Sequence, residues 1–310
     1  MKRETLERIR DVLGDRVHLN EPMSLHTSFR IGGPADLYAV AAKAQELVEL
    51  VSLAQEHDMP YLIIGQGTNI LVADKGIRGL VIENRLQIAD CKLQGDEATL
   101  HAESGALLSD LACESAQRGL AGLEWAVDIP GSVGGAIVGN AGAYGGYIAD
   151  VLRGATVLSA DGEVRCLTAS ELGFSYRTSR FKGQGTGGKG QGEVILSAEL
   201  ALHGDSVEVL EGRMAEYTRR REARQPSEPS AGSVFKRTEQ YPAGFLIEQA
   251  GLKGKRIGNA QVSPKHANFI VNLGAAKASD VKALIDLARE RVFTEFGIEL
   301  ELEIELVGEW

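Results

Sequence analysis

The chain has 310 residues, a formal net charge of −10 and 44% hydrophobic residues. This length predicts about two or three domains with a large buried core. The negative charge argues against a polyanion-binding protein, although a single basic cleft can still hold a phosphate.

The three cysteines, Cys91, Cys113 and Cys166, lie far apart and form no CxxC pair. This spacing argues against a disulfide framework and against a structural zinc site, so we expect no metal. The first residues, MKRETLERIRDVLGD, lack the apolar core of a signal peptide, and no apolar run approaches the ~18 residues that span a membrane. We therefore expect a cytoplasmic protein without membrane insertion.

The first part of the chain predicts a small α+β unit over residues 1–85. Helical spacing indicates helices over 3–14 and 42–58, and RIGGPA is expected to form a turn between two strands. A short apolar strand over 61–64 leads into the glycine-containing loop GQGTN at 65–69. The segment GIRGLVIENR then predicts a further strand.

The middle of the chain, residues 86–205, predicts strands near 98–104 and 154–160 with a helix over about 107–118. Between them lies IPGSVGGAIVGNAGAYGG at 129–146, in which seven of eighteen residues are glycine. A second glycine-rich segment, GQGTGGKGQG at 183–192, has no large apolar residue and is expected to be a surface loop or insertion.

The last part of the chain predicts a third domain over residues 206–297. Its helices are expected over 208–226, 242–252 and 279–297, with Ser279 capping the last helix and Gly297 ending it. From 298 to 306, apolar residues alternate with glutamates, which predicts a half-buried strand. This strand, within about 298–310, is expected to return to the first lobe.

The two glycine loops at 65–69 and 129–146 suggest a phosphate-containing ligand, because glycine amides can bind phosphate without an intervening side chain. Neither loop matches a P-loop or the full dinucleotide fingerprint. Val133 and Ile137 argue against a disordered linker at 129–146. The pair of loops therefore favours a long diphosphate cofactor that lies across two lobes.

Several long motifs then occur in a fixed order: HTSFRIGGPAD, IIGQGTNILVADKGIRGLVI, GLEWAVDIPGSVGGAIVGNAGAYGG, SYRTSRFK, PSAGSVFK, VSPKHANFIVN and FGIELELEIELVGE. With these motifs, residues 20–309 resemble the UDP-N-acetylenolpyruvoylglucosamine reductase family, in its shorter subtype without a substrate-stacking tyrosine loop. The resemblance implies an α+β fold: a two-lobed FAD-binding fold of the vanillyl-alcohol-oxidase/PCMH type, with the flavin between the lobes, plus a smaller substrate domain.

The resemblance also implies the cofactor FAD, the co-substrate NADPH and the substrate UDP-N-acetylglucosamine enolpyruvate, in peptidoglycan precursor synthesis. Protein partners are not implied. The positions that correspond to flavin contacts are Arg30, Gly65, Gly67, Thr68, Asn69, Ile70, Ile129, Pro130, Gly131, Ser132, Gly134, Gly135, Asn140, Ala141 and Gly142. At Gly131, Gly134, Gly135 and Gly142 we expect a side chain to compete with the cofactor for space.

Three positions carry over as catalytic: Ser233 as proton donor, and Arg177 with Glu303 as the pair that polarises the enolpyruvyl carboxylate. Without the resemblance, these residues would be interpreted as a turn serine, a surface arginine and a solvated glutamate. Tyr176, Arg221, Lys236 and His266 are weaker candidates for substrate contacts. A structural role for His266 and a solvated helix face for Arg221 remain alternatives.

The sequence departs from the family pattern at four places. Asp128 stands where glycine is usual, Gly139 where methionine is common, Arg237-Thr238 where Asn-Pro is usual, and Glu305 where an arginine is common. The last change puts the mode of diphosphate binding in doubt. Two alternatives remain open: an FAD-linked oxidase of a small alcohol or sugar, and a flavin-binding paralogue without turnover.

Overall fold

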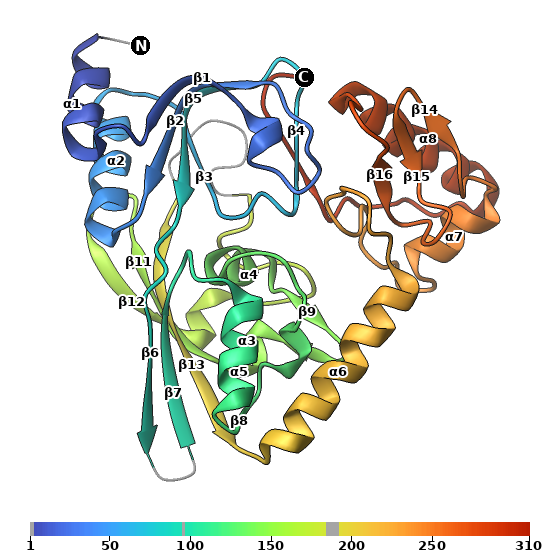
Figure 1. Ribbon diagram of the computed structural model, residues 1–310. Helices are drawn as coiled ribbons and strands as arrows, with labels where there is room; N and C mark the ends of the chain where they lie inside the picture. Colours follow the sequence, from blue (N-terminus) through green and yellow to red (C-terminus); the bar gives the residue numbers. More distant parts are fainter. Residues whose placement is uncertain (1–2, 95–96, 184–191) are drawn as a thin grey trace. The chain divides into compact units, whose positions relative to one another are not determined.

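The computed structural model describes residues 3–94, 97–183 and 192–310 (Figure 1). Most of the glycine-rich segment expected at 183–192 therefore lies outside the described residues. The chain forms two compact units, each built from three stretches of sequence. The first unit comprises 1–18, 37–66 and 79–220, and the second comprises 19–36, 67–78 and 221–310. The three-domain boundaries expected from the sequence remain a prediction.

An antiparallel sheet forms the centre of the first unit. Its strand order is β12-β11-β13-β7-β6, and a short strand β8 pairs with β13. The strands are β6 (Ala89–Gln94), β7 (Glu97–Glu103), β8 (Leu120–Ala121), β11 (Leu152–Leu158), β12 (Val164–Thr168) and β13 (Val194–Gly204).

One face of this sheet is covered by helices α3 (Leu108–Gln117), α4 (Val133–Gly139) and α5 (Ile148–Val151), which are green in Figure 1. Trp125, Ile137 and Leu200 lie in the core between them. Short 3-10 turns, η2 (Glu124–Ala126) and η3 (Ala169–Leu172), and the hairpin of β9 (Gly142–Ala143) with β10 (Gly146–Tyr147) connect these elements. Helix α6 (Val207–Arg224) follows the sheet.

A four-stranded sheet has the order β1-β2-β5-β3. Its strands are β1 (Val17–Pro22), β2 (Pro34–Ala41), β3 (Tyr61–Ile64) and β5 (Ile77–Asn84), and β3 runs parallel to β5. Helices α1 (Arg3–Leu13) and α2 (Ala44–Glu56) bury their apolar stripes against Leu80, Ile82 and neighbouring residues of this sheet.

The second unit is a small α+β structure. It contains α7 (Ala243–Gln249), α8 (Ala278–Phe296), the 3-10 turn η1 (Met23–Leu25) and a sheet of β14 (Arg256–Ile257), β15 (Ala260–Val262) and β16 (Ile270–Asn272). Strand β17 (Glu305–Val307) pairs in parallel with β4 (Ile70–Val72), so two segments far apart in sequence lie side by side. The core gathers Phe29, Phe235, Leu246 and Ile285.

Most predicted helices and strands are confirmed, with three corrections. The alternation over 298–306 does not form one long strand: only 305–307 is a strand, because β4 offers only three residues for pairing. The N-cap of α8 is Lys277 rather than Ser279, because the Asp74 carboxylate accepts hydrogen bonds from the amides of Ala278 (2.7 Å) and Ser279 (3.0 Å). The glycine-rich segment at 129–146 contains helix α4.

None of the helices in the described residues is both long and apolar enough to cross a membrane.

Candidate active site

The two predicted flavin loops meet within the first unit at Gly65 and Ser132. A Cβ atom at Gly65 would lie 2.4 Å from the Ser132 Oγ, so no side chain fits at residue 65. Ser132 is the N-cap of α4, and its Oγ accepts a hydrogen bond from the Gly135 amide at 3.3 Å. The first loop therefore packs directly on the residue that begins the helix of the second loop.

The first amides of α4 are occupied by the protein. The N–H of Val133 donates to Ala106 O (2.9 Å), that of Gly134 to Ser104 O (2.8 Å) and that of Gly135 to Ser132. By contrast, the first loop lies outside any helix, so the N–H groups of Gln66 and Gly67 are not used by helical hydrogen bonds. Backbone donors for a phosphate are thus offered by the first loop.

The space around the glycines corrects one expectation. A Cβ at Gly134 would lie 3.1 Å from Ser104, and one at Gly142 would lie 2.3 Å from the Tyr147 ring. At Gly142 a side chain would therefore overlap the protein itself, and at Gly134 it would press on Ser104. A Cβ at Gly135 would meet only the Ser132 Oγ, at 3.5 Å, so here the space is open to a ligand.

Arg177 is held by the second predicted flavin loop. Its guanidinium donates to Gly142 O at 2.9 Å and to Asn140 O at 3.4 Å, and it lies 5.6 Å from the centre of the Tyr176 ring. Asn140 ends α4 in a left-handed conformation, and its side-chain amide donates to Ser175 O at 2.9 Å. Arg177 is half-buried, whereas Tyr176 is exposed. Asn140 and Gly142, which were predicted as cofactor contacts, thus position Arg177, which was predicted as a catalytic residue.

Left-handed backbone is concentrated in this part of the chain. Among the described residues, eight non-glycine residues have a positive φ, including Arg30 (53°), Asp128 (58°), Asn140 (42°), Tyr144 (55°) and Arg177 (55°). Such conformations typically cost about 1–3 kcal/mol and cluster at functional sites. Two of the five are arginines, and the guanidinium of Arg177 donates to Gly142 O and Asn140 O.

Ser233 and Glu303 are brought together within the second unit. The N–H of Glu303 donates to the carbonyl oxygen of Val234 at 2.9 Å, so the predicted carboxylate lies beside the residue that follows the predicted proton donor. Ser233 and Glu303 are both half-buried. Glu303 is thus less exposed than its neighbour Glu301, a difference that the regular alternation of the sequence does not reveal.

Asn268 holds the strand-like segment that follows Ser233. Its carbonyl oxygen accepts from Val234 N (2.8 Å), its side-chain oxygen accepts from Phe235 N (3.0 Å), and its side-chain amide donates to Phe235 O (2.8 Å). Our sequence reasoning missed this residue. A signal was present, because Asn268 and Asn272 interrupt the apolar run ANFIVN and are both buried.

The remaining predicted contacts are more dispersed. Lys236 Nζ forms an ion pair with Glu301 at 3.1 Å. Burial lowers the pKa of His266, and the charges of Lys253 and Arg224 lower it further. The His266 Nδ1 accepts from the Asn268 amide at 3.2 Å.

The other predicted flavin positions have structural roles or lie in different units. Arg30 is exposed, and its carbonyl oxygen accepts a hydrogen bond from Asn272. Ile70 begins β4, and Ile129 packs against the core of the first unit. Thr68 and Ile70 lie in the second unit with Arg221, whereas Pro130, Gly131 and Ala141 lie in the first unit.

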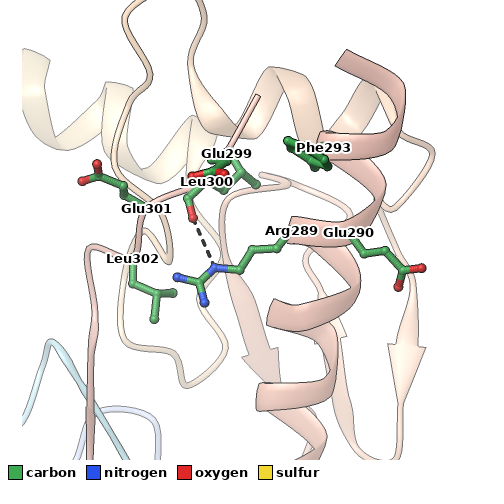
Figure 2. Close-up of a pocket in the computed structure, with 7 residues that line it drawn as sticks. All are labelled: Arg289, Glu290, Phe293, Glu299, Leu300, Glu301 and Leu302. Atoms are coloured by element: carbon green, nitrogen blue, oxygen red, sulfur yellow. Dashed lines mark hydrogen bonds between the residues drawn. The ribbon is translucent and has the colours of Figure 1, made fainter. Parts of the chain in front are cut away.

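A pocket of about 590 Å³ opens on the second unit (Figure 2). Its lining residues are Arg289, Glu290, Phe293, Glu299, Leu300, Glu301 and Leu302. Arg289 reaches from α8 and donates to Leu300 O at 3.2 Å. None of these lining residues is a predicted site residue, but residues 299–302 form the segment that leads to Glu303, and the other three lie on α8.

The predicted catalytic residues are divided between the units, with Arg177 in the first and Ser233 and Glu303 in the second. An FAD-binding domain family model matches residues 35–168. The paired glycine loops and the α+β fold fit an FAD cofactor. The fold and these loops therefore define a flavoprotein.

A second family model, UDP-N-acetylenolpyruvoylglucosamine reductase, C-terminal domain, matches residues 225–307. A reductase of that name from Alkaliphilus oremlandii is 48% identical over 297 residues, which are 95% of this chain and 94% of the relative. One from Symbiobacterium thermophilum is 45% identical, covering 97% and 96%. The chain belongs to the UDP-N-acetylenolpyruvoylglucosamine reductase family.

The crystal structure of UDP-N-acetylenolpyruvylglucosamine reductase from Thermus caldophilus is similar to this fold. It superimposes with a TM-score of 0.77 at 36% sequence identity, covering 94% of this chain and 98% of that one. The expected fold class is thereby confirmed.

Proposed function

We propose that this chain reduces UDP-N-acetylglucosamine enolpyruvate to UDP-N-acetylmuramate, with FAD as cofactor and NADPH as hydride donor. This places it in peptidoglycan precursor synthesis. Family membership over 95% of the chain supports the reaction. The structural observation that supports the catalytic assignment is the hydrogen bond from Glu303 N–H to Val234 O, which holds the backbone of Glu303 beside the residue that follows Ser233.

FAD, when bound, would supply the hydride-transfer chemistry between NADPH and C3 of the enolpyruvyl group. The residues proposed to hold it are those of the two glycine loops, with Gln66 and Gly67 offering backbone donors to a phosphate. The contact between Gly65 and Ser132 fixes the spacing of these loops before the cofactor binds. The two loops are thus already in contact before FAD binds.

Arg177 and Glu303 act on the substrate carboxylate. Hydride addition at C3 drives negative charge into the enolpyruvyl carboxylate, and the guanidinium stabilises that charge. The main-chain oxygens of Asn140 and Gly142 hold the guanidinium and prevent it from turning toward solvent. Glu303, protonated, would donate a hydrogen bond to the same carboxylate.

Ser233 donates a proton to C2 of the substrate. A serine hydroxyl is a weak acid, so an aligned position matters more than its intrinsic acidity. The segment after Ser233 is fixed on one side by Asn268 and on the other by Glu303. Lys236 is paired with the exposed Glu301 in this structure, so its ammonium would exchange this partner for the substrate.

Tyr176, Arg221, Lys236 and His266 are proposed to contact the substrate. The lowered pKa of His266 favours a neutral imidazole, which would act as a hydrogen-bonding group rather than as a cation. Arg221 would face the diphosphate, for which the forked guanidinium is suited. Glu305 stands where an arginine is common, so we infer that Arg221 and its neighbours supply more of the positive charge here.

We also propose a cytoplasmic location. Cys91, Cys113 and Cys166 are free thiols, two of them exposed, as is usual in a reducing compartment.

The test is an anaerobic stopped-flow experiment on the FAD-loaded protein. NADPH should bleach the flavin absorbance, and the enolpyruvyl sugar nucleotide should then restore it with formation of UDP-N-acetylmuramate. If the nucleotide never reoxidises the reduced flavin, the proposal is wrong. Reoxidation by oxygen after reduction with a small alcohol would instead support the oxidase alternative, and a protein that binds FAD but accepts no electrons from NADPH would be a paralogue without turnover.

A further inference from the structure

Asn69 makes two hydrogen bonds to the C-terminal segment. It is the last residue of the GQGTN loop, and its side-chain Nδ2 donates to Glu303 O at 3.1 Å. Its own carbonyl oxygen accepts from Glu305 N at 2.9 Å. Both contacts lie within the second unit, and Asn69 is half-buried there.

The second of these bonds begins a parallel strand pair. Residue 70 starts β4 and is opposite Glu305, the first residue of β17. No strand pairing extends N-terminal of residue 305 on this edge. The side-chain bond to Glu303 therefore continues the ladder two residues further, and a side-chain amide takes the place of a missing main-chain donor.

Glu303 is consequently held on both sides of its backbone. Its N–H is bound by Val234 O at 2.9 Å, and its carbonyl oxygen is bound by Asn69. Two hydrogen bonds of opposite direction fix the rotation of the chain about this residue. The direction in which its carboxyl side chain leaves the backbone is then fixed as well.

We propose that Asn69 is a positioning residue for Glu303, in addition to any contact with the cofactor. This inference rests on the proposed function, in which Glu303 acts on the enolpyruvyl carboxylate. One of the two side-chain N–H groups of Asn69 donates to Glu303 O, which leaves the second N–H and the side-chain oxygen for contacts with a cofactor. Ser28 makes a parallel connection, with a hydroxyl 2.7 Å from Ser230 O and an amide that donates to Gly67 O at 3.2 Å.

The test is a double-mutant cycle on substrate-dependent flavin reoxidation. Asn69→Ala should slow this step about 10-fold, the effect of losing one hydrogen bond that aligns a reacting group. Glu303→Gln should slow it about 10²–10³-fold. If Asn69 acts through Glu303, the double variant should be no slower than Glu303→Gln alone.

Two outcomes contradict the inference, and they differ from each other. If the two effects multiply, Asn69 does not act through Glu303, and the positioning role fails while the proposed function stands. If Glu303→Gln leaves reoxidation unchanged, the catalytic assignment fails and the positioning role fails with it. The substrate concentration for half-maximal rate should stay within about threefold in Asn69→Ala, since the rate constant rather than binding is affected.

Asn69→Asp provides a reversible version of the experiment. As a carboxylate the new side chain repels Glu303 O, so reoxidation should be slower than in Asn69→Ala near neutral pH. Once protonated it can donate again, so the rate should recover as pH falls toward about 4–5. A pH profile parallel to that of the unaltered protein would overturn the positioning role.

Asn259→Ala is the matched control. Asn259 accepts a hydrogen bond from Arg256 at 2.5 Å in the same unit, at the turn between β14 and β15. Its removal should leave both half-reactions within about twofold. If the rates are unchanged in Asn259→Ala, the slower reoxidation in Asn69→Ala and in Asn69→Asp is specific to position 69.

If Asn69→Ala does not retain FAD, the inference can still be tested by hydrogen exchange on the cofactor-free protein. Backbone hydrogen exchange of the segment 299–307 in the cofactor-free protein should accelerate in Asn69→Ala, because the side-chain bond holds Glu303 directly. In Asn259→Ala it should not change. Equal protection in Asn69→Ala and the unaltered protein would contradict the inference.

Discussion

Thr218 on α6 donates a hydrogen bond to the carboxylate of Asp128, a residue with a left-handed φ of 58°. The neighbouring Tyr217 stacks on Tyr144 with ring centres 4.3 Å apart, and the Tyr144 hydroxyl donates to Tyr217 O at 3.0 Å. One turn of α6 therefore binds both ends of the glycine-rich segment. This explains how an aspartate can occupy a place where the family usually has glycine: the backbone is the one that glycine adopts freely, and the side chain gains a partner.

Replacing Asp128 should reveal these two contributions separately. Asp128→Ala keeps the unfavourable left-handed backbone and loses the hydrogen bond, so we expect a loss of about 1–2 kcal/mol in the free energy of unfolding. Asp128→Gly loses the same bond but relieves the backbone, and should be less destabilising. Urea denaturation measures both. Equal losses in the two variants would show that the left-handed backbone contributes nothing.

The contact between the two flavin loops can be tested at Gly65. Gly65→Ala places a methyl group against the Ser132 Oγ and should reduce the amount of FAD retained on purification. Ser132→Ala removes that oxygen, so the double variant should recover part of the bound FAD. Recovery will be incomplete, because the α4 N-cap is lost at about 1 kcal/mol. Visible absorbance per protein gives the FAD content, and a double variant worse than Gly65→Ala would contradict the packing argument.

Ser233→Ala should separate the two half-reactions. Flavin reduction by NADPH needs no proton from Ser233, whereas substrate-dependent reoxidation does. Loss of a positioned proton donor typically slows its step by about 10²–10⁴-fold. Stopped-flow traces with NADPH and then with the enolpyruvyl nucleotide give both rates. Reoxidation at the normal rate would remove Ser233 as the donor.

The stability of the first unit should depend on Glu46 in acid. Two hydrogen bonds from the Arg16 guanidinium, at 2.7 and 2.8 Å, lower the pKa of Glu46 from 4.5 to about 2, opposed by partial burial. Because the folded-state pKa is the lower one, the pair stabilises the protein above pH 4.5 and loses that contribution as pH falls toward 2.

Glu46→Gln should therefore be destabilising by about 1 kcal/mol at pH 7, a modest value because Arg16 is partly exposed. Its difference from the unaltered protein should shrink below pH 4.5. Thermal unfolding at pH 7, 4 and 3 follows this difference. A difference that is independent of pH would show that Glu46 does not titrate as proposed.

Local patterns sufficed for the longer helices and for strands such as β3, β5, β7 and β11, but not for α4, α5 or the long strand β13. Spacing alone predicted α2 and the strand at 61–64, because an amphipathic helix and a short apolar strand each leave a local signal. Strand β4 was missed because it is stabilised by β17, a partner distant in sequence, whereas β6 was missed although it pairs with the adjacent β7. The Asp74 cap of α8 was missed for the same reason as β4, with 204 residues between the partners.

For the candidate site, the sequence predicted which residues matter but not the contacts between them. Motifs identified Ser233 and Glu303, but only the structure shows that Val234 joins them. The glycines of the second loop were correctly recognised as closely packed, but the reason differed at Gly134 and Gly142, where Ser104 and Tyr147 occupy the space. Such contacts depend on which segments meet in three dimensions. The glycine content of a loop does not tell which residue, here Ser104 or Tyr147, will pack against it.

The pairing of β17 with β4 bears on how the protein is made. Residues 70–72 leave the ribosome long before residues 305–307, and the second unit needs both. Until the last strand is synthesised, β4 and the loop before it have no partner on that edge, so this unit has a high contact order and should complete its folding late. The strands of the antiparallel sheet in the first unit have all been synthesised by residue 204. A nascent chain can therefore contain a folded first unit while the second unit is still incomplete. The apolar surface of the second unit should therefore stay exposed until residues 305–307 have been synthesised.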